Sequence, residues 1–338
     1  MPDGSTFSLA MVAAIPQSGQ GAAPVLCPVA DAVLPCAHGK HLVLGRRTLV
    51  MGILNVTPDS FSDGGRFTGL DAAIAHADRL VAEGADILDI GAESTRPGNE
   101  PVSQEEEQRR LLPVIARIAA RYPHLLISVD TYKARVAELA IAAGAAIIND
   151  VWAFRRDPAM ANVAAKTGAG VVVMHHCADP TSGDIHAGKN TSLDILDHAE
   201  NLFEEVLARA SNAGVRRESL ILDPGIGFGK TQEQNLRMIA SLDWLRSCFG
   251  LPILLGASRK SFIGVIAGSS PDQRLPGSLA AHLLGILAGA QIVRVHDVAA
   301  TVQAVKLAEA IMAAGNDSRE AATLALERSG AGSTWCDH

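Results

Sequence analysis

Three side chains that accept hydrogen bonds follow short aliphatic runs of the sequence. Asp130, Asn149 and Asp223 each come directly after such a run. If the runs are parallel strands of one sheet, their carboxyl ends meet at a common edge and present these side chains to one ligand. Carboxylate and amide oxygens suit a ring with several N–H donors. The alternative for each aspartate alone is that it caps the following helix.

A second group of residues is basic. Ser258-Arg259-Lys260 follows another aliphatic run, and Arg294 and His296 end the last one. Because Arg294 and His296 lie two residues apart on a strand, their side chains point to the same side. The alternative for Ser-Arg-Lys alone is a solvated basic turn. Ser-Arg-Lys, Arg294 and His296 together predict an anion site. This anion site and the three acceptor side chains combined predict a phosphorylated heterocycle, such as a pterin, as the ligand.

Two connections in the sequence are long and polar. The first runs from Asn55 to Gly65, and the second, Glu93 to Gly98, carries Arg96. Most strand-to-helix connections take only about two to six residues, so the first is expected to be a mobile functional loop. Arg96 could hold an anion through two parallel hydrogen bonds.

The aliphatic runs alternate with amphipathic segments, which is typical of parallel βα units. Ser103 followed by Glu106 predicts one helix start. The predicted strands are Val50–Leu54, Ile87–Ile90, Leu126–Val129, Ala146–Ile148, Gly170–Met174, Leu220–Leu222, Ile253–Leu255 and Ile292–Val295. The predicted helices include Ala72–Glu83, Ser103–Arg121, Ala134–Ala143, Leu193–Ala213, Glu233–Cys248, Ser278–Ala288 and Ala299–Ala313.

Eight continuously apolar strands fit a closed α/β barrel better than an open sheet. We therefore predict a single-domain (β/α)8 TIM barrel over residues 41–315, with a short strand pair within residues 41–49. Residues 1–40 are rich in Pro, Gly, Ser and Ala and are expected to form a mobile extension, and residues 316–338 a C-terminal tail.

Composition narrows the class of protein further. The formal net charge of −7 argues against nucleic acid as a partner, so any anionic ligand is held locally. An odd number of scattered cysteines is typical of reduced thiols in the cytoplasm: Cys27, Cys36, Cys177, Cys248 and Cys336. We expect neither a signal peptide nor a membrane span, because no uninterrupted apolar stretch approaches about 18 residues.

Seven ordered segments between roughly residues 48 and 314 form a more specific pattern. They are MGILNVTPDSFSDGG, DILDIGAESTRPG, SVDTYK, INDV, LDPGIGFGKT, GASRKSFIG and IVRVHDV. In these segments the chain resembles the dihydropteroate synthase family of pterin-binding enzymes. The resemblance implies a cytoplasmic transferase of folate biosynthesis, a target of sulfonamides, that joins p-aminobenzoate to 6-hydroxymethyl-7,8-dihydropterin pyrophosphate.

The resemblance also implies roles for individual residues. The pterin ring would be held by Asp130, Asn149, Met174, Asp223 and Lys260. Pyrophosphate would be bound by Asn55, Arg294 and His296, with Asn55 also contacting a Mg²⁺ cofactor. The p-aminobenzoate pocket would be shaped by Phe61, Thr95, Pro97, Phe228 and Ser261. The catalytic residues would be Asp63, Arg96 and Lys260, the first two by ordering the closed loops.

In this family pyrophosphate departs first, and the arylamine then captures a resonance-stabilised pterin cation. The resemblance also implies a homodimer through late helices. The residues at Phe61, Pro97 and Ser261 look like those of a sulfonamide-sensitive enzyme.

The sequence departs from the family pattern at three places. Ala92 replaces a glycine, and the aromatic residues of Trp152-Ala-Phe154 replace smaller ones. We expect these aromatics to pack under the barrel mouth, and the alternative is that they edge the ligand pocket. After Met174 the chain continues His175-His176-Cys177 in place of the more usual sequence, which leaves the role of both histidines open. With His186 they could suggest zinc, but the spacing does not favour a tetrahedral site.

Two other functions compete with the synthase hypothesis. A pterin-binding methyltransferase domain would share the acceptor pocket, but it would not need Arg294 and His296, since its ligand carries no pyrophosphate. A paralogue that binds pterin without turnover is the non-enzyme alternative, and activity of the purified protein separates it from the enzyme.

Overall fold

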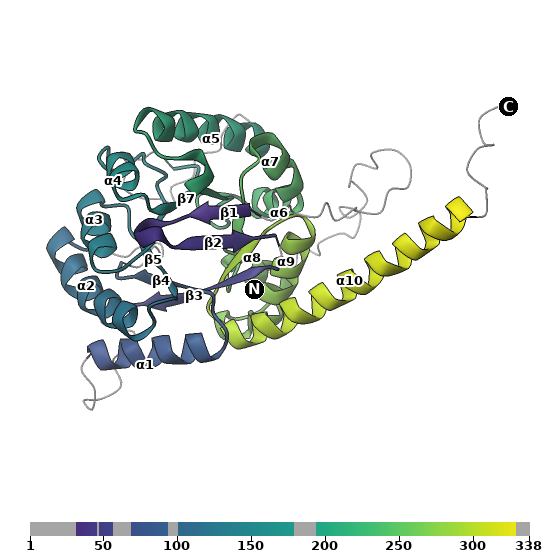
Figure 1. Cartoon of the computed structure of the whole chain (residues 1–338), viewed down its shortest axis with the longest axis horizontal. Coiled ribbons are helices and arrows are strands. Elements are labelled where there is room, and N and C mark those ends of the chain that lie inside the picture. Colours follow the sequence, from purple (N-terminus) through teal and green to yellow (C-terminus); the bar gives the residue numbers. More distant parts are fainter. Residues whose placement is uncertain (1–31, 46, 57–68, 94–100, 179–193, 329–338) are drawn as a thin grey trace, which may run out of the picture.

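The chain forms a barrel of eight parallel strands surrounded by helices (Figure 1). The structure, a computed structural model, describes residues 32–45, 47–56, 69–93, 101–178 and 194–328, with side chains up to residue 315. The strands are β3 (Leu49–Asn55), β4 (Ile87–Gly91), β5 (Leu126–Asp130), β6 (Ile147–Asp150), β7 (Gly170–Met174), β8 (Leu220–Asp223), β9 (Leu254–Leu255) and β10 (Ile292–Val295). All eight predicted strands are confirmed.

The sheet order is β8-β7-β6-β5-β4-β3-β10-β9, and a bridge between Leu222 and Ile253 joins its two edges into a barrel. Every residue of β4 and β7 is buried. This explains why the strands are mainly apolar in sequence, since helices cover one face and the barrel interior covers the other.

Helices follow most of the strands and form the outer layer (Figure 1). They are α1 (Gly69–Ala82), α2 (Gln104–Arg121), α3 (Ala134–Ala142), α4 (Met160–Thr167), α5 (Ile195–Asn212), α6 (Gln232–Ala240), α7 (Leu242–Phe249), α8 (Ser261–Ala267), α9 (Leu275–Leu287) and α10 (Val298–Arg328). The Ser103 hydroxyl accepts a hydrogen bond from the Glu106 N–H, which confirms the predicted start of this helix. The prediction of one helix over Glu233–Cys248 is wrong, because the non-helical backbone of Ser241 separates α6 from α7.

A hairpin lies across the amino-terminal end of the barrel strands (Figure 1). It consists of β1 (Ala32–Pro35) and β2 (His41–Leu44), which pair antiparallel. The predicted strand pair within residues 41–49 is therefore wrong in its bounds, since β1 precedes it. Apolar side chains of the hairpin and of the barrel strands form one cluster, which includes Leu34, Leu42, Leu44, Met51 and Ile87.

Helix α10 is the last helix of the barrel and continues well past it (Figure 1). Val298 and Val305 are buried, and Glu309 accepts a hydrogen bond of 2.6 Å from the Thr48 N–H, which ties α10 to β3. Residues 298–315 have a mean hydropathy of 1.3, so by length and composition alone this stretch could cross a membrane. The helix also extends into the segment that we predicted as a tail.

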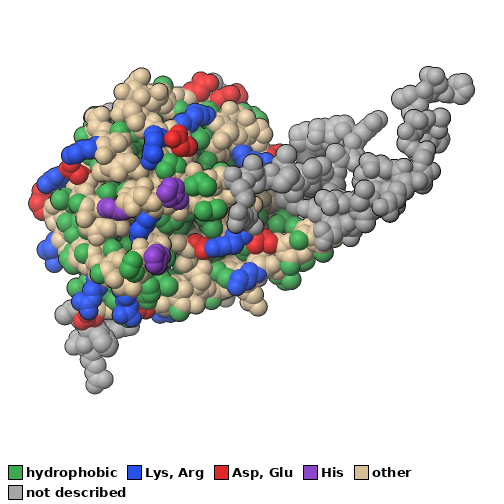
Figure 2. Space-filling model, in the orientation of Figure 1, with side chains coloured by type: hydrophobic (Ala, Val, Ile, Leu, Met, Phe, Trp, Pro, Cys, Tyr) green, Lys and Arg blue, Asp and Glu red, His purple; other side chains and the backbone are tan. Residues whose placement is uncertain are grey.

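The surface that carries the hairpin mixes acidic and basic side chains (Figure 2). Blue and red side chains alternate over this face without a continuous basic stripe.

Candidate active site

The register of the sheet brings polar residues into one row at the carboxyl ends of the strands. Asn55 of β3 pairs with Gly91, Gly91 with Asp130, and Asp130 with Asn149. Gly91 lies next to Asp130, and a Cβ added at Gly91 would be only 3.3 Å from the Asp130 Cβ. Three residues assigned to the ligand by the sequence thus lie on neighbouring strands at the mouth of the barrel.

Asp223 lies at the same end of β8, where it pairs with Met174 of β7. Its side chain accepts a hydrogen bond of 2.7 Å from the Gly225 N–H, so the turn after β8 fixes the carboxylate. Gly225 has a φ of 62°, and a Cβ there would come within 1.9 Å of the His175 carbonyl oxygen. Only glycine fits this turn, which explains the glycine-rich sequence after Asp223.

Arg294 joins the acceptor residues through two ion pairs. Its guanidinium donates to Asp89 at 2.6 Å and to Asp130 at 2.7 Å. Asn149 donates to the same Asp89 oxygen at 3.0 Å, while the other Asp89 oxygen is buried without a partner in the described part of the chain. The residues predicted for ring binding and for anion binding therefore share one network.

Burial shifts the pKa values of these groups. It raises the pKa of Asp130 to about 7, against the effect of Arg294, and it also raises the pKa of Asp223. Burial and the charge of Arg294 lower the pKa of Lys260 to about 8. Despite burial, Asp89 and Asp130 raise the pKa of Arg294, which stays charged. Such shifts are common in binding and catalytic sites.

An apolar cluster borders the polar row. Met174, Trp152 and Phe228 are buried together, and the ammonium of Lys260 lies 4.1 Å from the centre of the Phe228 ring. Aromatic and thioether side chains of this kind can pack on the face of a planar ligand. Trp152 belongs to this cluster and Phe154 to the main core, so the two aromatics that we grouped together have different surroundings.

Asp150 shapes the turn that carries Trp152. Its two carboxylate oxygens accept the N–H groups of Trp152 and Phe154 at 2.9 and 2.7 Å. Ala153 and Phe154 adopt φ values of 52° and 61°, which are unfavourable for residues with side chains. Buried hydrogen bonds to Asp150 therefore hold the backbone in a conformation that places Trp152 beside Met174.

The cationic loop after β9 is held by the residues that directly follow β10. Ser258 hydrogen-bonds His296 at 3.0 Å, and Arg259 forms an ion pair with Asp297. Burial, together with Arg294, lowers the pKa of His296 to about 3, so its ring is neutral and can donate a single hydrogen bond. Ser261 is exposed at the start of α8.

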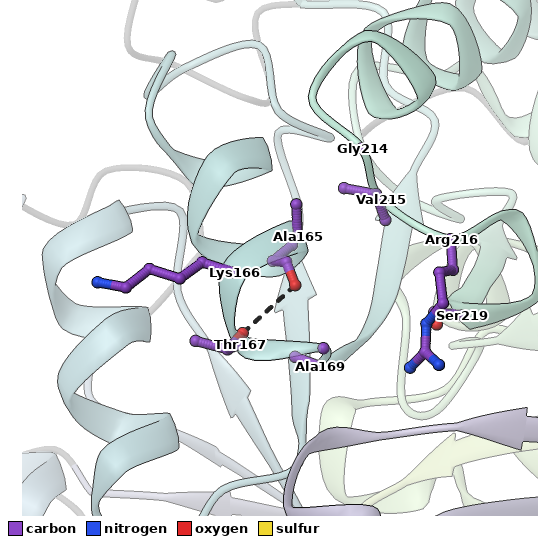
Figure 3. Close-up of a pocket in the computed structure, with 10 residues that line it drawn as sticks. Ala165, Lys166, Thr167, Ala169, Gly214, Val215, Arg216 and Ser219 are labelled. Carbon is purple, nitrogen blue, oxygen red and sulfur yellow. Dashed lines mark hydrogen bonds between the residues drawn. The ribbon is translucent and has the colours of Figure 1, made fainter.

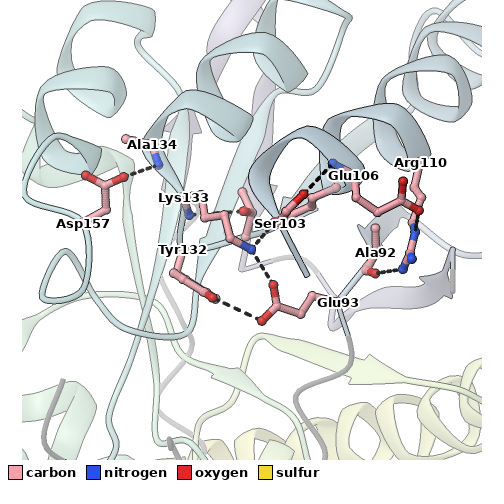
Figure 4. Close-up of polar contacts among 11 residues, drawn as sticks. Ala92, Glu93, Ser103, Glu106, Arg110, Tyr132, Lys133, Ala134 and Asp157 are labelled. Atoms are coloured by element: carbon pink, nitrogen blue, oxygen red, sulfur yellow. Dashed lines mark hydrogen bonds and ion pairs between the residues drawn. The ribbon is translucent and has the colours of Figure 1, made fainter. Parts of the chain in front are cut away.

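Glu93, where the second polar connection begins, is held by two neighbours (Figure 4). Its carboxylate accepts from Lys133 at 2.5 Å and from the Tyr132 hydroxyl at 3.2 Å. Lys133 also pairs with Glu107, which is almost fully buried, and Arg110 donates to the Ala92 carbonyl at 3.1 Å. These contacts fix the chain as it leaves β4.

Five of the predicted site residues lie outside the described residues: Phe61, Asp63, Thr95, Arg96 and Pro97. The structure brings together Asp130, Asn149, Met174, Asp223, Phe228, Lys260, Arg294 and His296. Sequence reasoning missed Asp89, although an acidic residue inside the apolar run Ile87–Ile90 was a usable signal. Ser258 was part of the predicted basic loop, but its contact with His296 depends on the fold and was not predicted.

A separate cavity lies at the other end of β7 and β8 (Figure 3). It has a volume of about 400 Å³ and is lined by residues before these strands, among them Thr167, Gly168, Val215, Arg216 and Ser219. Because it lies at the amino-terminal ends of the strands, it is distinct from the polar row. The strand carboxyl ends, where α/β barrels carry their chemistry, remain the candidate active site.

The fold and the polar row define a TIM-barrel protein with a mouth suited to a charged heterocycle. The family model of the pterin binding enzymes matches residues 51–296. A dihydropteroate synthase of Clostridium beijerinckii is 47% identical over 274 residues, which cover 81% of this chain and 97% of the relative. The chain therefore belongs to the dihydropteroate synthase family of pterin-binding enzymes.

Solved structures agree with this assignment. A Xanthomonas albilineans dihydropteroate synthase with 4-aminobenzoic acid has a TM-score of 0.77 at 46% identity, covering 84% of this chain and 99% of that one. Another structure from the same organism, in complex with 7,8-dihydropteroate, has a TM-score of 0.73 at 44% identity and covers 82% and 99% of the two chains.

Proposed function

We propose that the protein condenses p-aminobenzoate with 6-hydroxymethyl-7,8-dihydropterin pyrophosphate to give 7,8-dihydropteroate and pyrophosphate. The observation that carries this proposal is the placement of Asp130, Asn149 and Asp223 beside Lys260 and Arg294 at one barrel mouth. The relatives of known structure, which were solved with 4-aminobenzoic acid and with 7,8-dihydropteroate, support the choice of substrates.

The residue types account for a mechanism in which the leaving group departs first. Asp130 and Asp223 accept N–H groups of the pterin and offset positive charge that develops on its ring. Arg294 and His296 lie where they can stabilise negative charge on the departing pyrophosphate. The arylamine nitrogen then attacks the cationic methylene carbon and loses its proton. This route needs no protein nucleophile.

Asn55 is the residue that we assign to Mg²⁺. It is half-buried at the carboxyl end of β3 and shares the row of Asp130, so its amide oxygen suits an ion that prefers oxygen ligands and substrate phosphates. When bound, Mg²⁺ would neutralise part of the pyrophosphate charge.

We further propose a cytoplasmic homodimer that is sensitive to sulfonamides. Large apolar side chains on the late helices are exposed, namely Leu284 and Leu287 of α9 and Leu307 and Ile311 of α10. Helices α9 and α10 contact one another, so these side chains belong to adjacent elements. An exposed apolar surface of this kind is typical of a subunit interface.

The test is pyrophosphate release by the purified protein with Mg²⁺ and the pterin pyrophosphate, with and without p-aminobenzoate. We expect release that depends on p-aminobenzoate and yields dihydropteroate. Asp130→Asn and Lys260→Ala should each reduce turnover by at least about a hundredfold, because each removes a charge that faces the reacting ligand.

The matched controls are Asp78→Asn and Lys166→Ala, which alter surface ion pairs of α1 and α4 and should leave turnover within about twofold. Ligand binding without turnover would favour the non-catalytic paralogue. Methyl transfer without any use of the pyrophosphate ester would favour the methyltransferase.

A further inference from the structure

Behind the pterin pocket, three potential metal ligands come together from two elements. His175 and Cys177 follow β7, and His198 lies in the first turns of α5. One donor atom from each residue lies within 4.8 Å of the other two. His175 and Cys177 are buried and His198 is half-buried. None of the three has a part in the proposed reaction.

The two imidazole rings already face one another. His175 Nε2 and His198 Nδ1 are 2.8 Å apart, and the ring planes meet at 81°. A hydrogen bond between the rings accounts for this contact, and a metal ion bound by the same two nitrogens would take its place.

The donor set is typical of zinc. Two neutral imidazoles and one thiolate are the ligands that Zn²⁺ prefers, whereas Mg²⁺ and Ca²⁺ select oxygen. Around a tetrahedral Zn²⁺ the donor atoms lie roughly 3.3 to 3.7 Å apart, as follows from bond lengths of about 2.0 to 2.3 Å. The ring nitrogens would separate slightly and the sulfur would approach, both through side-chain rotation.

We propose that His175, Cys177 and His198 form a zinc site that joins the end of β7 to α5. The site adds to the proposed synthase reaction and does not take part in it. His175 directly follows Met174, and its N–H donates to the Asp223 carbonyl at 2.8 Å, so the ion would brace the backbone beneath the pterin pocket. Lys230, which follows β8, donates to the His175 carbonyl at 3.0 Å, so both peptide groups that flank His175 are held.

The spacing of these histidines in the sequence did not favour a zinc site. Adjacent His175 and His176 do not have the spacing of a tetrahedral site, and that argument still holds for His176, which packs edge-on against Trp152 at 4.7 Å. The contribution of His198 depends on the docking of α5, which sequence spacing does not reveal. Cys177 lies two residues after His175, so both can serve one ion.

The experiment measures metal content and the spectrum of the cobalt form. Protein purified without a histidine tag would be loaded with Zn²⁺ alone and dialysed, and bound zinc counted by mass spectrometry. A second sample would receive Co²⁺, whose visible and near-ultraviolet bands report tetrahedral geometry and a cobalt–thiolate bond. We expect about one metal ion per chain and a thiolate charge-transfer band.

Cys177→Ser and His198→Gln should each lower Zn²⁺ affinity by at least roughly a hundredfold and abolish the cobalt band. Cys248→Ser, which alters an exposed thiol, and His76→Gln, in α1, are the matched controls and should keep both. Circular dichroism would establish that each variant is folded. Wild-type protein that retains no zinc and gives no thiolate band overturns the proposal, as does a band that is lost in Cys248→Ser instead.

Dihydropteroate formation separates this proposal from the proposed function. Turnover without zinc binding would overturn the zinc site alone, whereas zinc binding without turnover would overturn the synthase assignment alone.

Discussion

The two ends of the barrel are built from contrasting residues. At the amino-terminal end, Leu34, Leu42 and Leu44 of the hairpin pack on the first residues of the strands, and the cluster is apolar throughout. At the carboxyl end, Asp89 and Asp130 are buried or nearly so and are paired with a single arginine. The barrel therefore carries this hydrophobic cluster of the hairpin and the strand starts, called the plug below, at one end and buried charges at the other.

The contrast shows where stability and function reside in this fold. Burial of apolar surface at the hairpin stabilises the barrel. Burial of carboxylates at the mouth opposes folding, as the raised pKa values of Asp130 and Asp223 indicate. Carboxylates whose burial opposes folding are typical of a site that binds a charged ligand.

The largest expected effect comes from a change in the plug. Leu44→Ala removes a fully buried side chain and should lower the free energy of unfolding by about 2 to 5 kcal/mol. Chemical denaturation measures the loss, and turnover below the unfolding transition should not change. Val43→Ala, at a neighbouring side chain that is 47% exposed, is the control and should stay within about 0.5 kcal/mol. Equal losses in both variants would contradict the role of the plug.

A smaller effect is expected at the mouth from Glu93→Gln. The amide keeps the shape of the side chain but weakens its contacts with Lys133 and Tyr132, so the connection after β4 is held less firmly. We expect the KM for p-aminobenzoate to rise about three- to tenfold, which corresponds to roughly 1 kcal/mol. Steady-state kinetics measure it, with Glu138→Gln in a surface ion-pair network as control. An unchanged KM would mean that Glu93 has no influence on the binding of p-aminobenzoate.

The smallest effect concerns pH. In the free enzyme Asp130 has a pKa raised to about 7, so its binding-competent carboxylate forms as pH rises through that value. Lys260, with a pKa lowered to about 8, loses its charge above it. We expect kcat/KM for the pterin substrate to be bell-shaped with limbs near these values. The acidic limb should disappear in the residual activity of Asp130→Asn, and its persistence would assign the limb to another group.

The strands and most of the polar row were predictable from the sequence. Continuous apolar runs define buried parallel strands, and a residue that directly follows such a run must lie at the strand's carboxyl end. Asp130, Asn149 and Asp223 were found in this way. Arg294 and His296 were found because residues two apart on a strand share a face.

Contacts between distant parts of the chain were not predictable. Arg294 pairs with Asp89, 205 residues away, and nothing in local spacing connects them. The break at Ser241 and the position of β1 also depend on tertiary packing, which overrides the periodicity of the sequence. Helix α4 was missed because it has only 8 residues and begins shortly after the turn held by Asp150.

The closure of the barrel between β8 and β9 has a consequence for motion. Strand β9 has only 2 residues, and a single bridge from Leu222 to Ile253 joins it to β8. The Gln291 side chain accepts a hydrogen bond from the Ile253 N–H at 3.2 Å and supplements this short ladder. Local opening should therefore begin at this seam, and amides there should exchange with solvent sooner than those of β4 or β5. Asp223 and Lys260 flank the seam, so the active site lies where the barrel can open locally while the rest of it stays folded.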